Sequence, residues 1–418
     1  MTSLAYAALW FFVFSVPWEN VIRVPGLGAV SRLTGIIALA LALLVAVISG
    51  RIRRWHLFHV AALLFVIWAG AGVLLFSMET IPKKLWTYMQ LFLVLWMMWE
   101  LAPSKKRQLG LLTAYVFGAS VSAISTIMVF RRSVGATRFA ASGFDANDLA
   151  AALVLALPMA WYLGLTYHRP LLRWICRAYL PLGLVAIGLT GSRGGLIGTA
   201  LALMIVPLSM TRLTPGKLVV ALSVLCISGF LAVAYVPEST VTRLASTSTE
   251  LEEGRLGGRV KIWVAGVRAF SHRPVLGYGT SGFRAAIAPY LPTVPQVAHN
   301  SYLSVLVEQG IVGFVLYLVM FGSVFRAVLT LSTTDRRFAL VLLATLIVIM
   351  LPLAWEDRKP VWFILAALLG LARAAGTSRG HAQYPQSDPG RTMPAPPAVA
   401  RWRQPLSARR NAERDATA

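Results

Sequence analysis

Residues 297–325 read VAHNSYLSVLVEQGIVGFVLYLVMFGSVF. After a polar start the segment is almost continuously apolar, and it exceeds the length of about 20 residues with which a helix crosses a bilayer. It therefore predicts a membrane-spanning helix, tilted or bent, that begins directly after His299. A titratable side chain at such a boundary is costly to place, which makes His299 a candidate for chemistry on a substrate that is itself partly in the membrane.

The composition extends this prediction to the whole chain. Of the 418 residues, 57% are hydrophobic and only 13% are charged, and the mean hydropathy is +0.69. Soluble domains of this length do not have such a composition. The net charge of +23 would suit a nucleic-acid-binding protein, but the basic residues lie between apolar segments and in the tail instead of forming one stripe. We therefore expect an all-α polytopic membrane protein with no nucleic acid partner.

About twelve segments have the length and apolar content of membrane spans. They lie near residues 4–18, 31–49, 57–77, 85–102, 108–130, 148–166, 174–190, 194–211, 217–236, 300–325, 337–355 and 361–374. The first is interpreted as a retained span because no basic region or cleavage pattern accompanies it. The resulting organisation is helices 1–9 in residues 1–236, a large outer loop with an amphipathic helix in 237–298, helices 10–12 in 299–374, and a basic tail in 375–418. The tail is rich in Pro, Ala, Arg, Gln and Ser, which predicts disorder.

The loops between these spans differ in charge, and this predicts the orientation. One alternating set is rich in Lys and Arg with almost no acid, as at Arg51–Arg54, Lys105–Arg107 and Arg336–Arg337. Basic loops are retained in the cytoplasm. Both termini are therefore expected in the cytoplasm, and the large loop is expected on the opposite side.

The outer side also carries cations against this bias. They are Lys83, Lys84, Arg131, Arg132, Arg138, Arg193, Arg243, Arg255 and Arg259. An anionic ligand approached from the outer leaflet would explain them. The alternative is that they extend to lipid headgroups, above all Lys83 and Lys84. That alternative explains Arg193 less well, because this residue lies in a tight turn between two predicted spans.

Within the outer loop, a helix is predicted from Arg259 to His272. Its apolar stripe consists of Val260, Trp263, Val264, Val267 and Phe270. Arg259 falls at the edge of this stripe and is expected to point into the protein, whereas Lys261 and Arg268 are expected to be solvated. The stretch that follows, RPVLGYGTSGF at 273–283, has glycines that would let its backbone approach a ligand closely. As a phosphate-binding signature it is weak, because it does not follow a buried strand.

His299 is a candidate general base. It lies at the expected N-terminus of the next helix, where unsatisfied N–H groups and the helix dipole disfavour a protonated ring, and a neutral imidazole can accept a proton. Arg193, Arg259 and His299 map to one membrane face, where two guanidiniums would hold a phosphate-rich leaving group while the base takes the proton of an attacking hydroxyl. The alternatives are an interfacial histidine and, for Arg259, a salt bridge with Glu252 or Glu253.

No metal or other cofactor is strongly implied. The outer acids are scattered, although Asp145 and Asp148 would suit a divalent ion together with a diphosphate. The same residues also form a turn with an N-cap for the helix predicted near 148–166, and this is the interpretation we prefer.

Four stretches resemble the O-antigen ligase family, within the wider ligase and polymerase superfamily of bacterial envelope glycan assembly. They are GFDANDLA at 143–150, TGSRGG at 190–195, GRVKIW at 258–263 with PVLGYG at 274–279, and HNSYL at 299–303 with Gly310 and Gly313. Each motif is short and loose, but their joint order within a polytopic chain is quite specific.

The resemblance implies an all-helical fold with a large periplasmic loop, distantly like lipid-dependent (GT-C-type) glycosyltransferases, in the bacterial inner membrane. It implies a metal-independent, inverting transfer of a glycan from undecaprenyl diphosphate to a sugar hydroxyl of lipid A–core, on the periplasmic face, in lipopolysaccharide biosynthesis. His299 matches the residue taken as the base, and Arg193 and Arg259 match the diphosphate ligands. Arg138 and Asn300 are further candidates for substrate binding.

Relatives in the superfamily use the same elements differently. O-antigen polymerases join lipid-linked repeat units to each other, and O-linked oligosaccharyltransferases transfer the glycan to a protein, often with an added extracytoplasmic C-terminal region that the expected short tail disfavours. Overall length, the single large outer loop and the motif combination favour the ligase. A transporter of lipid-linked glycan would carry mid-membrane charges in paired halves, whereas the predicted spans are nearly charge-free at their centres. A structural scaffold would leave the outer Arg and His residues unexplained.

Overall fold

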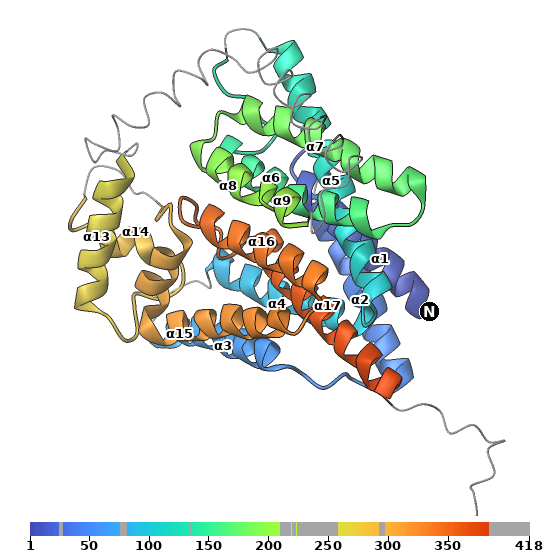
Figure 1. Cartoon of the computed structure of the whole chain (residues 1–418). Coiled ribbons are helices and arrows are strands. Elements are labelled where there is room, and N and C mark those ends of the chain that lie inside the picture. Colours follow the sequence, from blue (N-terminus) through green and yellow to red (C-terminus); the bar gives the residue numbers. More distant parts are fainter. Residues whose placement is uncertain are drawn as a thin grey trace, which may run out of the picture. The chain divides into compact units, whose positions relative to one another are not determined.

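The computed structural model describes residues 1–24, 28–75, 82–133, 136–209, 258–291 and 297–383, with Val219 and Ser223, and Met1–Thr377 forms one compact unit. The helices are α1 (Thr2–Ser15), a short 3-10 helix (Val16–Trp18), α2 (Val30–Ser49), α3 (Leu57–Leu75), α4 (Lys83–Leu101), α5 (Lys105–Arg132), α6 (Ala146–Thr166), α7 (Pro170–Thr190), α8 (Arg193–Leu203), α9 (Ile205–Ser209), α13 (Arg259–His272), α14 (Phe283–Ile287), α15 (Ser301–Leu329), α16 (Thr333–Ile349) and α17 (Lys359–Gln383) (Figure 1). Two short strands, β1 (Arg23–Val24) and β2 (Gly28–Ala29), pair antiparallel.

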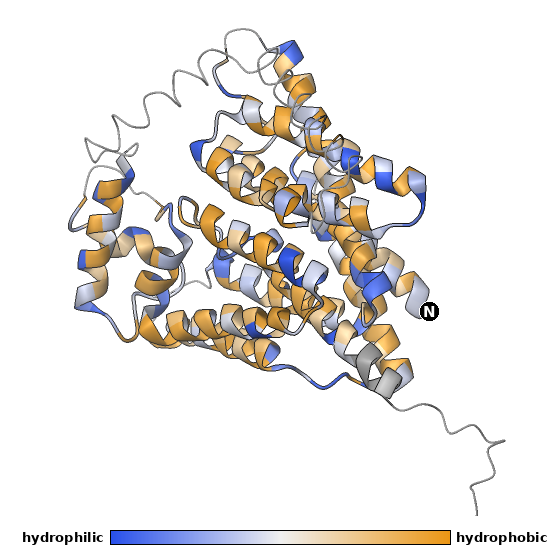
Figure 2. Cartoon of the chain, in the orientation of Figure 1, coloured by the Kyte–Doolittle hydropathy of each residue, from blue (hydrophilic) through white to orange (hydrophobic). Residues whose placement is uncertain are grey.

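Seven helices in the described part of the chain are long and apolar enough to cross a membrane: α2, α3, α5, α6, α7, α15 and residues Lys359–Gly376 of α17. They differ in burial, since 89% of the apolar stretch of α6 is buried but only 17% of that of α2. α2 instead exposes large apolar side chains such as Ile36, Val47 and Ile48, and apolar residues cover most helices in Figure 2. Exposed apolar area of this extent needs lipid around it, so the chain is a nearly all-helical, multi-pass membrane protein.

Helices occupy the segments predicted as spans, except that the segment predicted at 217–236 lies almost wholly outside the described residues. The segment near 194–211 is divided into α8 and α9 by a break at Met204. α1 and α8 are shorter than a full span, and α16 has 17 residues. The positions of these helices are therefore confirmed, while the number of crossings remains a prediction.

The boundary predicted for the C-terminal tail was too early. α17 continues past residue 374 to Gln383, so the first residues of the segment predicted as disordered are helical. Alanines such as Ala374 and Ala375 favour a helix, and the next proline in the sequence, Pro385, is the residue that cannot continue one. The rest of that segment lies outside the described residues.

Helix α13 has the bounds predicted from the sequence, and it packs against α14 and α15. Its buried face was predicted only in part, since Trp263 and Phe270 of the predicted stripe pack against the buried cluster. The buried residues are Ile262, Ala265, Gly266 and Ala269, whereas Val264 and Val267 are 47% and 57% exposed. Gly266 allows the close approach, because a Cβ there would lie 2.9 Å from Leu303 Cδ2 on α15. Small residues therefore select the contact face, a preference that hydrophobic periodicity does not detect.

Helix α15 is bent, as its length predicted. Gly310 has φ +62° and ψ −169° inside the helix, which interrupts the regular hydrogen bonding. The glycine-rich stretch supplies the missing partners, because Tyr278 N donates to Val307 O (3.0 Å), Gly279 N donates to Glu308 O (2.8 Å) and Ile311 N donates to Pro274 O (2.8 Å). The close approach expected from these glycines is thus made to the backbone of α15, which corrects the expectation that they approach a ligand.

A second set of hydrogen bonds ties this bend to α3. Trp68 Nε1 donates to Gln309 O (2.9 Å), Gln309 Nε2 donates to Thr280 Oγ1 (3.0 Å), and Thr280 Oγ1 donates to Ala69 O (2.8 Å). All three side chains are mostly enclosed, and buried polar groups are costly unless they are paired. The bend, the 274–282 segment and α3 therefore form one connected unit.

Replacing Gly310 should destabilise this unit. In Gly310→Ala the new Cβ would overlap the Val275 carbonyl oxygen, and the positive φ would strain any side chain; we expect a loss of about 2–3 kcal/mol of unfolding free energy. Gly322→Ala is the matched control on the same helix, because nothing lies within 4 Å of a Cβ there. Thermal unfolding of the detergent-purified variants measures both, and equal midpoints for the two would contradict the bend.

Candidate functional site

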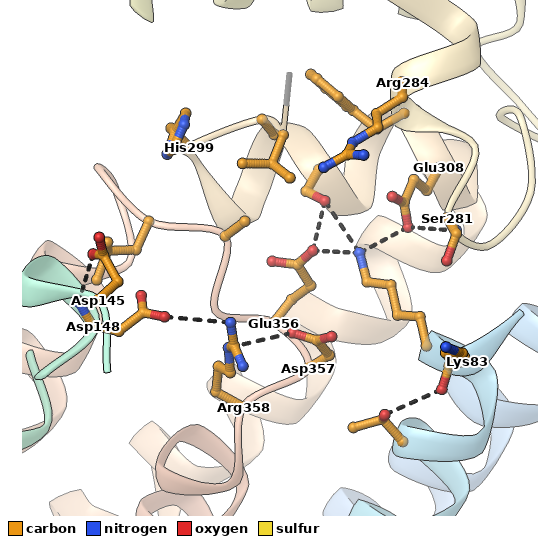
Figure 3. A pocket seen from close by; sticks show the side chains of 18 of the residues that line it. Lys83, Asp145, Asp148, Ser281, Arg284, His299, Glu308, Glu356, Asp357 and Arg358 are labelled. Carbon is orange, nitrogen blue, oxygen red and sulfur yellow. Dashed lines mark hydrogen bonds and ion pairs between the residues drawn. The ribbon is translucent and has the colours of Figure 1, made fainter. Parts of the chain in front are cut away.

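A cavity of about 640 Å³ lies where the N-terminal ends of α4, α6 and α15 approach the segment before α17 (Figure 3). Its lining includes Ser281 and His299, which are the two non-glycine residues with positive φ in the described ranges, at 67° and 44°. Such backbone conformations cost energy and concentrate at functional sites. The cavity is therefore our candidate site, and it contains the histidine singled out from the sequence.

The turn that presents His299 is held by the cap of α15. Asn300 is the N-cap residue, and its Oδ1 accepts from Tyr302 N and from Leu303 N, both at 3.0 Å. These bonds satisfy N–H groups that the first helical turn leaves without partners. Asn300, a further candidate for substrate binding, thus has a structural role as the residue that fixes where His299 emerges.

Neighbouring segments hold the same turn from two sides. Ser301 Oγ donates to Leu353 O and accepts from Trp355 N, both at 2.8 Å. From the other side, Trp263 Nε1 on α13 donates to Ala298 O at 3.1 Å. Ala298 and Ser301, on either side of His299 and Asn300, are therefore both anchored, which restricts where the imidazole can lie.

The surroundings of His299 keep its ring neutral. Burial lowers the pKa of His299 below its usual value, and the nearby Arg259 lowers this pKa further, while Asp145 and Asp148 oppose the shift. The direction agrees with the sequence-based prediction, but the main causes are burial and a guanidinium instead of the helix dipole. A neutral ring at neutral pH can accept a proton.

The structure places Arg259 near His299, Asp145 and Arg193. Arg259 is half-buried, whereas Lys261 and Arg268 are exposed, as predicted. Burial lowers the pKa of Arg259; Asp145 raises this pKa, and Arg193 is close enough to lower it. The two arginines do not line the cavity itself; Arg259 lies near Asp145, which does, and Arg193 lies near Arg259. The alternative partners Glu252 and Glu253 lie outside the described residues.

A tight turn positions Arg193. α7 ends at Thr190, Gly191 adopts φ +58°, and Ser192 caps α8 by accepting from Gly195 N at 3.2 Å. Arg193 is thus the first residue of α8, as expected from the short polar sequence between two apolar segments.

Arg138 stabilises this turn from the side. Its Nε donates to Thr190 O at 2.9 Å, and its Nη2 donates to Asn147 Oδ1 at 2.8 Å. The guanidinium therefore joins the end of α7 to the start of α6, next to the cavity. This geometry favours a role in positioning for Arg138, which the sequence had suggested as a further substrate ligand.

The acids of the 145–148 turn are engaged in structure. Asp145 Oδ1 caps α6 by accepting from Asn147 N at 2.8 Å, which confirms the cap preferred from the sequence. Asp148 accepts from Trp355 Nε1 at 2.9 Å and pairs with Arg358 at 3.3 Å. Within the described part of the chain, no three His, Cys, Asp or Glu side chains are grouped so that they could hold a metal ion.

The sequence analysis missed a buried ion cluster on the opposite wall of the cavity. Lys84 Nζ lies 2.9 Å from Glu308 Oε2 and 2.5 Å from Glu356 Oε1, so it does not extend to headgroups. Ser304 Oγ also donates to Glu356 Oε1, at 2.5 Å, and Ser281 N donates to Glu308 Oε2, at 3.1 Å. A signal was present in the sequence, because a lone carboxylate such as Glu308 inside an apolar span requires a partner.

Comparisons with known proteins match the same region of the chain. The profile of the family described as O-antigen ligase matches residues 178–318, a region that contains Arg193, Arg259 and His299. An O-antigen ligase of Pseudomonas aeruginosa is 25% identical over 279 residues, which are 64% of this chain and 57% of that protein. The match thus spans little more than half of the relative's length. These two matches support the resemblance to the O-antigen ligase family that the motifs and their order had indicated.

Proposed function

We propose that this protein is an O-antigen ligase, which transfers a glycan from undecaprenyl diphosphate to a sugar hydroxyl of lipid A–core in lipopolysaccharide biosynthesis. In this proposal His299 is the general base, and Arg193 and Arg259 bind the donor diphosphate. The observation that supports this proposal most is that Arg259 is close enough to both His299 and Arg193, from two other distant segments, for their charges to interact beside one cavity.

The arrangement fits a displacement at the anomeric carbon. The acceptor hydroxyl enters the cavity, its proton passes to the neutral imidazole of His299, and its oxygen forms the new glycosidic bond as the bond from the sugar to the diphosphate breaks. The attack comes from the side opposite the leaving group, so the anomeric configuration inverts. Two guanidiniums match the charge and geometry of the departing diphosphate, and this step needs no metal.

The polar walls of the cavity suit a sugar acceptor. Glu308, Glu356 and Asp357 line the cavity away from Asp145 (Figure 3), and carboxylates accept hydrogen bonds from hydroxyl groups. Arg259 lies near Asp145 instead, with Arg193 near Arg259. Anionic and hydroxyl-rich parts of the substrates are thereby assigned to different sides of one cavity.

The proposed topology follows from the same assignment. The chain crosses the bacterial inner membrane about twelve times, with both termini in the cytoplasm and the His299 cavity facing the periplasm. The basic loops support this orientation. The large loop of residues 237–298 then lies on the side where lipid-linked glycan and lipid A–core would meet.

His299 should be required for transfer but not for folding. We expect His299→Gln to lower the rate by about 10²–10⁴-fold, which is the usual contribution of a general base, while its thermal unfolding stays near that of the wild type. His272→Gln is the matched control, because His272 is an exposed histidine at the C-terminal end of α13, the opposite end from Arg259.

The measurement uses purified protein in nanodiscs, undecaprenyl-diphosphate-linked glycan, lipid A–core and a chelator. The proposal is supported if the wild type and His272→Gln form core-linked glycan and His299→Gln does not. Full activity of His299→Gln would remove the base assignment. Longer lipid-linked glycan with unmodified core would instead indicate a polymerase, and no product of either kind would indicate a transporter.

The pH dependence of transfer should report on His299. The neutral ring is the active form, so the rate should fall as the pH drops through a pKa that lies below the usual histidine value. Asp145→Asn keeps the cap of α6 but removes a carboxylate that raises this pKa, so we expect the acid limb to move to lower pH. Initial rates of both proteins over a pH series test this, and a limb that moves upward or stays in place would contradict it.

A further inference from the structure

A second cavity, of about 780 Å³, is strongly cationic. The charged and aromatic residues that line it are Arg53, Arg54, His56, Trp99, Arg326 and Arg373. Among the described residues that line this cavity there is no carboxylate. Nothing in the transfer reaction proposed above uses these residues.

The two cavities lie at opposite ends of the same helices. On α4, Lys84 lines the His299 cavity and Trp99 lines the cationic cavity. On α15, Ser304 lines the His299 cavity and Arg326 lines the cationic cavity. With a rise of about 1.5 Å per residue, these pairs are separated by roughly 22–33 Å along the helix axes. That distance is close to the thickness of the hydrocarbon core, so the cationic cavity lies at the membrane surface opposite the His299 cavity.

Arg53 is held rigidly in this cavity. Its Nη1 donates to Trp99 O, its guanidinium carbon lies 4.1 Å from the centre of the Trp99 ring, and its backbone N donates to Glu100 Oε1 at 3.0 Å. A cation over an aromatic face with a fixed hydrogen bond has little freedom left to lose on binding a ligand. The site is therefore prearranged and differs from a set of mobile surface arginines.

The cations repel one another. Burial lowers the pKa of Arg53, and Arg373 lowers it further while Glu100 opposes the shift. Burial and the same Arg373 also lower the pKa of His56. Like charges held together at the edge of a low-dielectric region cost energy, which a bound anion would recover. A phosphate group matches several guanidiniums best, because it accepts paired hydrogen bonds from them.

Apolar surface adjoins the cations. Leu57 lines the cavity and is 59% exposed, and Phe325 and Leu329, near Arg326 on α15, are 47% and 45% exposed. α15 packs directly against α3, which carries Leu57. Phosphate-binding cations beside exposed apolar side chains suit a ligand with a charged head and hydrocarbon chains.

We propose that this cavity binds the phosphate group of an anionic membrane lipid, with the acyl chains along α3 and α15. Basic pockets between membrane helices are suited to such headgroups. The inference does not depend on the transfer reaction, and it would hold for any member of the superfamily with the same surface. Free phosphate or diphosphate shares the headgroup chemistry, and the experiment below separates the two sources.

The test uses native mass spectrometry of the full-length protein in detergent. Phosphatidylglycerol and phosphatidylcholine with identical acyl chains are titrated in parallel, and pyrophosphate is titrated alone and in competition. Arg54→Gln/Arg326→Gln removes two exposed cations from the cavity, and Arg51→Gln/Lys106→Gln removes two exposed cations that do not line it. Thermal unfolding of each variant confirms that it is folded.

We expect phosphatidylglycerol to bind more tightly than phosphatidylcholine, and its affinity to fall about tenfold in the cavity variant but not in the control. Equal binding of the two lipids, or equal losses in the two variants, would overturn the proposal. Pyrophosphate that binds tightly while phosphatidylglycerol does not would also overturn it, because it would assign the cavity to a soluble anion.

Discussion

The break in α15 at Gly310 is the constraint on which the site depends. A helix interrupted at membrane depth exposes N–H and C=O groups that lipid cannot satisfy, and the 274–279 segment satisfies them with three backbone hydrogen bonds. This contact holds the segment after α13 against the membrane helix that follows His299. α13, which carries Arg259, packs on the same α15. The bend thereby determines which parts of residues 258–291 lie near the histidine.

The buried charge of Lys84 adds a second constraint. A mostly enclosed lysine is stable only with close anionic partners, and Lys84 pairs with Glu308 and Glu356. These contacts join α4, α15 and the segment before α17 at one point of the cavity wall. The bend and this cluster share Glu308, whose carbonyl accepts from Gly279 N and whose carboxylate accepts from Lys84. Backbone and charge therefore hold the same region of α15.

Local patterns in the sequence predicted the parts of the site that local chemistry determines. The run of apolar residues after His299 predicted where α15 begins. The acidic turn at residues 145–148 predicted the cap of α6. The helical spacing of apolar residues, followed by Pro274, predicted the bounds of α13. The buried face of α13 could not be predicted in the same way, since it depends on how closely Gly266 lets α15 approach. The partners of Lys84 lie 224 and 272 residues away, and no single-sequence pattern relates such positions. His299, Arg193 and Arg259 were grouped only by their common membrane face and by the family resemblance.

Central to the proposed function is that guanidiniums beside His299 hold the donor diphosphate. The most direct measurement is the equilibrium affinity of an undecaprenyl-diphosphate-linked glycan for Arg259→Gln and for Arg268→Gln, two variants of the same helix. Arg259 is half-buried near Arg193 and Asp145, whereas Arg268 is exposed. The account predicts that Arg259→Gln weakens binding about 10–100-fold and that Arg268→Gln leaves it unchanged. Equal affinities for the two variants would contradict the claim.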